Sequence, residues 1–366
     1  MSKAAELANL IGNINMGGGG VGRNLLINGA MTVAQRSTSV TGLGATAGYF
    51  GLDRWKTDFS STAGRLTLTQ DSSVPTGEGF FDSLKVACTT ADTSLAAGEQ
   101  FTIEQMIEAQ NCQVISKGTS GAKPLTLSFY CKANANATYV VELYAQDVDR
   151  RISSLFNVTT DWTRVTVTFP ADTTGEITND NGGGIKVSWW LHAGSNYSGG
   201  TLQTTWAAAA DNTRATGGDS FFDSTSRTFF LTGCQLEVGQ NATKFEHEPF
   251  ERTLLKCKRY LQVYNSYGSS YAHFPSLGQG SSSSINWNHE LPIQMRDTPA
   301  LETSGDWRVQ DTYGGSYYTL SSIAISSGDS TDKLVRGSAT TSSAIGTDIG
   351  RILSYGDSSA RWTYKS

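Results

Sequence analysis

The sequence has little charge and no concentration of one sign. Only 17% of its 366 residues are Asp, Glu, Lys or Arg, the net charge is −5, and no dense cluster of Lys and Arg occurs. Proteins that bind nucleic acid carry such clusters against the phosphates, so we expect no nucleic-acid partner. The scarcity of Lys and Glu beside 39 glycines and abundant Ser and Thr favours strands and turns over helices.

Long apolar runs are also missing. No stretch approaches the ~20 residues of a membrane-spanning helix, so we expect no membrane insertion. The N-terminus has no apolar core followed by a cleavage site, which argues against a secretory signal peptide. The cysteines are far apart in the chain and form no CxxC pair: Cys88, Cys112, Cys131, Cys234 and Cys257. We expect them to be buried free thiols of a protein made in a reducing cytoplasm. A single disulfide is the alternative.

Recognisable catalytic and metal-binding motifs are absent. HExxH and GxSxG do not occur, and no GK[ST] follows the glycines at 17–20. None of the histidines belongs to a cluster at metal-site spacing, so neither a metal site nor a cofactor is predicted: His192, His247, His273 and His289. Two of the 33 acidic residues could still meet as a glycosidase pair, so a hydrolase stays as the minor alternative.

The chain does contain a succession of β-rich runs between Gly, Asn, Asp and Ser turns, at 125–130, 139–144, 164–169, 185–191 and 228–231. Such spacing predicts a sandwich or barrel. Residues 249–264 mix charged and apolar residues and predict a short helix after Pro249. We therefore expect a β-sandwich over 24–250, a short helical connector over 251–264 and a smaller C-terminal β-sandwich domain over 265–366.

Residues 1–23 form a separate segment, a short helix followed by a Gly-rich linker at Gly17–Gly20. A helix this short is marginal alone in water and must dock on another surface. The flexible linker favours docking on copies of itself or on a larger assembly, with packing on its own domain as the alternative. The apolar positions at helical spacing are the predicted attachment and oligomerisation residues: Leu7, Leu10, Ile11 and Ile14.

Four aromatic residues lie close together in the chain: Trp189, Trp190, Tyr197 and Trp206. Neighbouring residues of a strand point to opposite faces, so one of the two adjacent tryptophans is expected in the core and the other near a surface. Exposed aromatic rings bind the apolar faces of sugars, and these four are the predicted carbohydrate-binding residues. The alternative is that neighbouring strands or a partner chain cover both tryptophans.

Several strings, spread over residues 24–299, resemble jelly-roll, carbohydrate-binding-like modules in fibre and virion proteins of tailed bacteriophages. The opening SKAAELANLIGN also resembles N-terminal segments of marine phage fibre proteins. The strings that carry the resemblance are Asn24–Met31, Ala34–Arg36, Leu52–Trp55, Thr160–Arg164, Gly233–Gly239, Ala242–Glu246, Cys257–Tyr260 and Pro292–Pro299.

The resemblance implies a jelly-roll over 24–250 and a non-enzymatic virion protein, assembled in the host cytoplasm and carried on the tail or capsid surface. It implies a homotrimeric tail fibre or fibre-like adsorption protein, attached to other virion proteins by its N-terminus, whose β-domains bind host surface glycans. Two alternatives stay open: a capsid decoration protein or head fibre without glycan recognition, and a glycan depolymerase.

The resemblance has two further implications. Modules of this kind include ones with a structural calcium ion, which stays an open expectation because no D-x-D-x-D-G loop is visible. Within one string, Asp53 and Arg54 can form a charge-assisted pair with Trp55 buried beside them. These three residues are therefore predicted to be framework and not ligand-binding.

The N-terminal helix generates the first prediction. Because its apolar stripe is too short to be stable alone, we expect the full-length chain to be trimeric and a chain starting at Gly22 to be monomeric. Light scattering of both proteins measures this. An unchanged oligomeric state after the deletion would show that the helix is not the oligomerisation element and would leave docking on the virion as its role.

Overall fold

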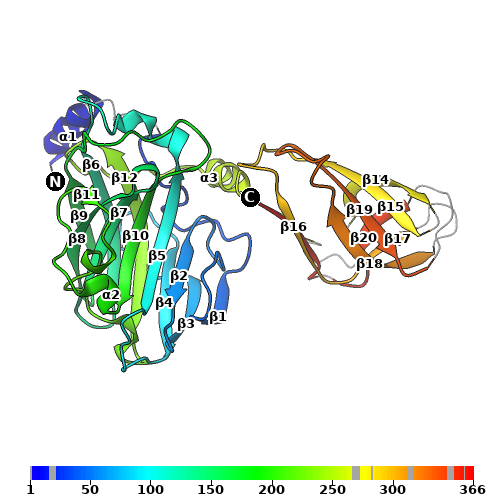
Figure 1. The fold of residues 1–366 in the computed structure, drawn as a ribbon, viewed down its shortest axis with the longest axis horizontal. Coiled ribbons are helices and arrows are strands. Elements are labelled where there is room, and N and C mark those ends of the chain that lie inside the picture. The colour runs from blue at the N-terminus through cyan, green and yellow to red at the C-terminus, as the bar shows by residue number, and fades with distance from the viewer. Residues whose placement is uncertain are drawn as a thin grey trace. The chain divides into compact units, whose positions relative to one another are not determined.

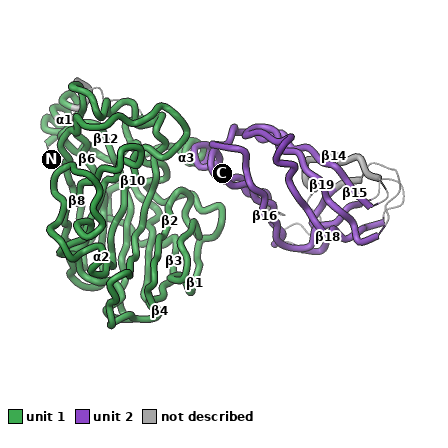
Figure 2. Tube along the Cα trace, in the orientation of Figure 1, with its two compact units in different colours: residues 1–253 green, residues 254–366 purple. Residues whose placement is uncertain are grey.

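The computed structural model describes residues 2–15, 22–265, 273–281, 283–310, 316–343, 350–357 and 359–366. They belong to two compact units, Met1–Thr253 and Leu254–Ser366, coloured separately in Figure 2. The chain is mainly β, as predicted (Figure 1). Within the described part of the chain, no helix is long and apolar enough to span a membrane.

Unit 1 contains two six-stranded antiparallel sheets (Figure 1). The first sheet has the order β1 (Ser39–Leu43), β3 (Arg65–Asp71), β4 (Ser83–Thr90), β12 (Thr228–Val238), β6 (Leu125–Ala133) and β9 (Thr163–Phe169). The second sheet has the order β11 (Ala207–Ala208), β8 (Arg150–Val158), β7 (Ala137–Ala145), β10 (Gly183–Ala193), β5 (Gln100–Glu108) and β2 (Lys56–Ser60). The five β-rich runs predicted from the sequence are confirmed as β6, β7, β9, β10 and β12.

The chain passes repeatedly from one sheet to the other, as in a jelly-roll. Strand β12 lies between β4 and β6, and β10 lies between β7 and β5, so both central strands pair with strands distant in sequence. Apolar side chains of the two inner faces form one core, with Leu66 and Phe129 from the first sheet and Val141 and Trp189 from the second. The predicted jelly-roll sandwich is therefore the observed fold of unit 1.

Helices are few and short in the described residues. Besides α1 (Lys3–Asn15) and α3 (Phe250–Lys258), they are one turn of α2 (Ser195–Ser198) and the 3-10 segments η1 (Ala109–Ile115), η2 (Gln146–Val148), η3 (Asp211–Thr213) and η4 (Phe221–Asp223). The helix predicted after Pro249 is α3, and the remainder of the predicted connector contains strand β13 of unit 2.

Helix α1 lies against unit 1 itself. Ser2 caps it by accepting a hydrogen bond from the amide of Ala5 at 3.3 Å, and Glu6 pairs with Lys244 at 3.1 Å. The apolar positions Leu7 and Ile11 stay 57% and 47% exposed, and Leu10 is half-buried. The Gly17–Gly20 linker and the side chain of Ile14 lie outside the described residues. The alternative of packing on its own domain is thus observed, yet the apolar stripe keeps exposed positions.

The segment before β1 docks on the central strand β12. The side chain of Asn24 accepts from the amide of Leu236 at 3.1 Å and donates to the carbonyl of Cys234 at 3.0 Å. The carbonyl of Gly29 accepts from the Cys234 amide at 3.0 Å. A Cβ on Gly29 would overlap the Cys234 carbonyl oxygen, so glycine is required at this approach. Two of the strings that carry the family resemblance are therefore contact partners.

Asn28 joins this segment to the predicted framework residues. It has a left-handed backbone with φ of 58° and is 3% exposed. Its side-chain amide donates to the carbonyls of Val33 and Asp53, both at 2.9 Å, and its side-chain oxygen accepts from the Val33 amide at 3.0 Å. The Trp55 indole donates to the Asn28 carbonyl at 3.0 Å. Each of these groups is buried, so the bonds replace those that water would supply.

The two charged framework residues are also buried and bonded. Burial raises the pKa of Asp53, although its carboxylate accepts from the Gln35 amide at 2.9 Å. Arg54 has a positive φ of 74° and donates to the carbonyl of Met106 in the second sheet. These contacts agree with a framework role for the segment that precedes β2.

All five cysteines are buried and free, which confirms the expectation from their spacing. Burial raises the pKa of the Cys112 and Cys131 thiols to about 12, and that of Cys234 also rises. These thiols stay protonated at neutral pH and act as small apolar side chains of the core.

Unit 2 is a smaller β-domain, as expected, and includes a closed barrel where the sequence predicts a sandwich. Its strands form a three-stranded sheet and a closed barrel around three tryptophans packed edge to face, Trp287, Trp307 and Trp362. The sheet has the order β13 (Leu261–Asn265), β21 (Arg361–Lys365) and β16 (Ala300–Ser304). The barrel has the order β14 (His273–Ser281), β15 (Ser284–Glu290), β19 (Leu334–Thr341), β18 (Tyr317–Ile325), β17 (Trp307–Gln310) and β20 (Gly350–Ser354).

Replacement of Asn28 tests the docking of the first segment. Asn28→Gly keeps the left-handed backbone but removes three buried hydrogen bonds, so we expect a loss of about 3 kcal/mol in the free energy of unfolding of unit 1. Urea denaturation followed by tryptophan fluorescence measures it. Asn157→Ala, at an exposed position of β8, is the control and should change stability by less than about 0.5 kcal/mol. Equal effects of the two substitutions would contradict the assigned role.

The buried His289 predicts a pH dependence for unit 2. Its Nδ1 lies 3.1 Å from the Tyr364 hydroxyl, and burial lowers its pKa to about 4. The folded unit therefore keeps this imidazole neutral down to about pH 4, whereas the unfolded chain protonates it below ~6.5. Unit 2 should lose up to about 3 kcal/mol as the pH falls through this window. The loss should be absent in His289→Gln and retained in His247→Gln, as measured by urea unfolding at several pH values.

Candidate functional site

The two predicted tryptophans are not available as a binding surface. Trp189 is fully buried in the main core, with ring centroids 5.5 Å from Trp55 and 5.4 Å from Phe129. Trp190 points to the opposite face, as the strand geometry requires, but is only 2% exposed. The Arg214 guanidinium lies 4.4 Å from its ring centroid. The expectation that one of the pair lies near a surface is wrong, because the segment after β10 covers the outer face.

The other two predicted aromatics are half-buried and lie in different surroundings. Tyr197 packs against Trp190 with ring centroids 5.3 Å apart. The Trp206 indole donates to the carbonyl of Pro170 at 2.8 Å, and the Lys117 ammonium lies 5.5 Å from its ring centroid. The four aromatics therefore do not form one platform, and only Trp190 and Tyr197 come together.

The outer face of the second sheet carries a band of polar residues across five strands. Strand pairing places Lys56, Glu104, Ser188, Glu142 and Ser153 side by side. Glu104 pairs with Lys56 at 3.0 Å and with Lys186 at 3.1 Å. Burial raises the pKa of Glu104, but the two ammonium groups outweigh it and hold the pKa below its usual value.

The second carboxylate of this band, that of Glu142, also forms an ion pair. Glu142 is fully buried and accepts two hydrogen bonds from Arg214, at 3.0 Å and 2.7 Å. Tyr144, beside it, is covered by the Arg151 guanidinium at 4.7 Å from the ring centroid. The band is thus a network of charge pairs, and the lowered pKa of Glu104 is the opposite of the raised pKa that a general acid needs at neutral pH.

A pocket in unit 1 offers aromatic rings that remain exposed. It has a volume of about 360 Å³ and is lined by side chains from residues 24–32, 79–81 and 245–253. We call it the phenylalanine pocket. Phe81 and Phe250 line it with 80% and 52% of their surface exposed. Its wall at 24–32 is the segment that docks on β12.

The floor of the phenylalanine pocket is a packed aromatic cluster. Phe80 has its ring centroid 5.0 Å from Phe245 and 4.9 Å from His247. Gly233, with φ of 61°, makes room for it, because a Cβ there would lie 2.6 Å from the Phe80 ring. His247 donates from Nε2 to the Glu78 carbonyl at 2.9 Å, which fixes its ring.

Polar groups complete the pocket. The Glu246 carboxylate accepts from the amides of Gly22 at 2.6 Å and Asn24 at 3.2 Å, and Thr32 and Glu248 also line the pocket. An apolar aromatic floor with a few fixed polar groups is the common composition of small-ligand sites. No sequence pattern predicts this pocket, because its rings come from segments about 165 residues apart and follow no strand or helix period.

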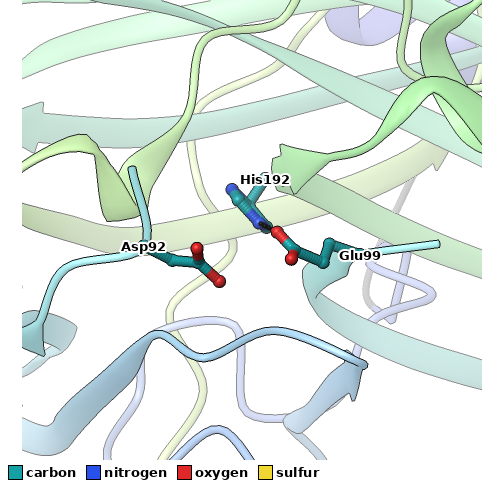
Figure 3. A group of neighbouring side chains, drawn as sticks. All are labelled: Asp92, Glu99 and His192. Atoms are coloured by element: carbon teal, nitrogen blue, oxygen red, sulfur yellow. Dashed lines mark hydrogen bonds and ion pairs between the residues drawn. The ribbon is translucent and has the colours of Figure 1, made fainter. Parts of the chain in front are cut away.

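A second group that the sequence does not predict is a buried cluster of Asp92, Glu99 and His192 (Figure 3). Potential ligand atoms of the three side chains all lie within 4.8 Å of one another. His192 Nε2 is 3.1 Å from a Glu99 oxygen, and its Nδ1 is 2.8 Å from the Ser220 hydroxyl. The two acids are close in sequence, but His192 joins them only through the pairing of β10 with β5.

The environment of this cluster sets its protonation. Burial lowers the pKa of His192 against the opposing effect of Glu99. Burial alone would raise the pKa of Asp92, but hydrogen bonds from Thr62 and from the amide of Ala63 outweigh it, and the pKa is lowered. At neutral pH the group therefore holds an ionised Asp92 and a neutral imidazole.

Ser220, His192 and Glu99 also form a hydrogen-bonded chain like that of a catalytic triad, in which a hydroxyl nucleophile, a histidine base and a carboxylate follow one another. The Ser220 hydroxyl, however, accepts a hydrogen bond from the Phe222 amide as the cap of η4. His192 itself is 1% exposed. A buried base and a hydroxyl engaged in capping favour a structural or metal-binding group over a nucleophilic one.

Comparison with known proteins gives matches of fold only. No family model and no curated protein matches the chain. Among solved structures, the enzymatically active domain of tailspike protein 4 of bacteriophage CBA120 is 10% identical with a TM-score of 0.31, covering 59% of this chain and 21% of that chain. The chain thus matches about a fifth of that protein's length.

Two further similar structures are carbohydrate-binding modules. TmCBM61 in complex with β-1,4-galactotriose is 9% identical with a TM-score of 0.31, covering 59% of this chain and 99% of that chain. The family 11 module from Clostridium thermocellum in complex with a mixed-linked tetrasaccharide is 10% identical with a TM-score of 0.28, covering 56% of this chain and all of that chain.

Proposed function

We propose that the protein is a non-enzymatic virion protein of a tailed bacteriophage that binds a neutral glycan of the host surface through the phenylalanine pocket. The observation that carries the glycan proposal is the pair of exposed rings, Phe81 and Phe250, over an apolar floor with fixed polar groups at one side. Aromatic faces bind the apolar faces of sugars, and carboxylates and hydroxyls bind their hydroxyl groups.

The character of the pocket favours a neutral ligand. Glu246 and Glu248 both line it, and the whole chain carries a net charge of −5. An anionic polymer would meet like charge there. Affinity per site would be low, and several copies on one particle would raise the overall avidity by ~10²–10⁴ over a single site.

The virion role is supported by the family resemblance of the sequence strings and by α1. This helix keeps Leu7 and Ile11 exposed, although a monomeric protein gains stability by burying such residues. In our proposal, α1 attaches the chain to itself as a trimer or to another virion protein, on a tail fibre or a fibre-like adsorption structure. Assembly takes place in the host cytoplasm.

The absence of catalysis is part of the proposal. Both acids of the polar band on the second sheet are paired with cations, and Glu104 has a lowered pKa. A glycan depolymerase would need one carboxyl group with a raised pKa as general acid. Purified protein is therefore expected to release no oligosaccharide from host polysaccharides, and release from any of them would favour the depolymerase.

Substitution of the exposed rings tests the glycan proposal. Each ring can bury about 50 Å² against a sugar, so Phe81→Ala and Phe250→Ala should each weaken binding about tenfold. A glycan array identifies the ligand, and calorimetry measures its affinity. Leu155→Ala, which removes a 44% exposed apolar side chain of β8, is the matched control and should bind normally.

Two outcomes would contradict the glycan proposal. Binding that survives both phenylalanine substitutions but is lost in Trp206→Ala or Tyr197→Phe would move the site to the residues singled out from the sequence. A protein that binds neither a glycan nor host cells would keep only a structural role. Electron microscopy of labelled particles then separates a tail fibre from a capsid decoration protein or head fibre.

A further inference from the structure

We propose that Asp92, Glu99 and His192 bind one divalent transition-metal ion of the zinc class, which ties together the segments that meet at this end of the sandwich. This site is separate from the phenylalanine pocket and does not depend on glycan binding. The ion has a structural role, because its three ligands are 7%, 4% and 1% exposed.

The geometry suits a metal ion. The three side chains come from two segments and point toward one another (Figure 3). Asp92 and Glu99 belong to the connection between β4 and β5, and His192 is near the end of β10. Zinc ligands lie ~2.0–2.2 Å from the ion, which places ligand atoms of a tetrahedral site about 3.4 Å apart. The 3.1 Å between His192 Nε2 and Glu99 is already close to this value.

Groups around the cluster hold the ligands in place. Ser220 lies 2.8 Å from the other ring nitrogen of His192, so the single hydrogen of a metal-bound imidazole is donated from Nδ1 to that hydroxyl. Asp92 accepts from the Thr62 hydroxyl at 2.9 Å and from the Ala63 amide at 2.7 Å through one oxygen. Such outer partners fix the orientation of metal ligands and raise the affinity.

The charge of the cluster provides the second argument. Among the residues that the structure describes, neither Asp92 nor Glu99 has a Lys or Arg within ion-pair distance. Other buried acids of unit 1 do have such a partner, as Glu142 pairs with Arg214 and Asp172 pairs with Lys117. Buried carboxylates without a balancing cation are costly, and a divalent ion between them removes that cost.

The ligand types select the class of metal. Calcium takes six to eight oxygen ligands, whereas an imidazole nitrogen with two carboxylates suits zinc and its neighbours. The site therefore differs from the structural calcium expected by resemblance. Water completes the fourth position. Because Asp92 is also bonded to the β2–β3 connection at Thr62, the ion holds two loops and the end of β10 together.

Metal analysis of the full chain tests the proposal. Protein stripped with EDTA and dialysed against Zn²⁺ should retain one ion per chain by mass spectrometry. Its unit 1 melting temperature should rise by about 5 °C or more at 100 times the Kd. Co²⁺ in place of Zn²⁺ should give visible bands without the sulfur charge-transfer absorption that a cysteine site would show.

Variants separate the site from adventitious binding. Asp92→Asn and Glu99→Gln keep the shape and remove the charge, so each should lose the bound ion. Ser220→Ala should bind about 10–100-fold more weakly. His289→Gln removes another buried histidine and should keep one ion per chain. Folding of each variant is checked by circular dichroism without metal.

Two results would overturn the proposal. Wild-type protein that retains neither Zn²⁺ nor Co²⁺ would show that the cluster is a hydrogen-bonded network only. Equal retention of the ion by wild type, Asp92→Asn and Glu99→Gln would place the metal elsewhere. Because the Co²⁺ spectrum is recorded on the wild type, the test stands even where a variant fails to fold.

Discussion

The docking of residues 24–36 on the sandwich is the interaction on which the candidate site depends. Asn24 and Gly29 bond this segment to the central strand β12, and Asn28 bonds it to the chain before β2. The docked segment is also one wall of the phenylalanine pocket. Since Asn28 and Arg54 have positive φ angles, the backbone is held in this path by buried hydrogen bonds that water cannot replace.

Buried charge shapes the rest of unit 1. On the outer face of the second sheet, Glu104 forms ion pairs with two lysines, and Glu142 forms an ion pair with an arginine. The arginine comes from the segment after β10, which also covers Trp190. On this face Trp190 is therefore buried, and Tyr197, which packs against it, is half-buried. The open aromatic surface lies instead where the chain enters and leaves the sandwich.

Local patterns predicted the fold well. The β-rich runs at 125–130, 139–144, 164–169, 185–191 and 228–231 are all strands, since β-rich composition between turn residues is a local property of the chain. The opposite orientation of Trp189 and Trp190 also followed from strand geometry. Their burial did not, because it depends on a loop that returns over the sheet. The sequence spacing of His192, Asp92 and Glu99 also gave no sign that they are neighbours. The pairing of β10 with β5 brings the histidine to the two acids.

The sequence by itself therefore determined the β class, the strands of the sandwich, the helix after Pro249 and the free state of the cysteines, because each follows from composition or from neighbouring residues. Tertiary structure alone decided which aromatic rings stay exposed and which acids share a site. Phe81 and Phe250 are far apart in the chain, as are Asp92 and His192. The residues of such a pair come together only when the strands pair in the correct register and the loops take their folded conformation. The packing of the whole unit determines both.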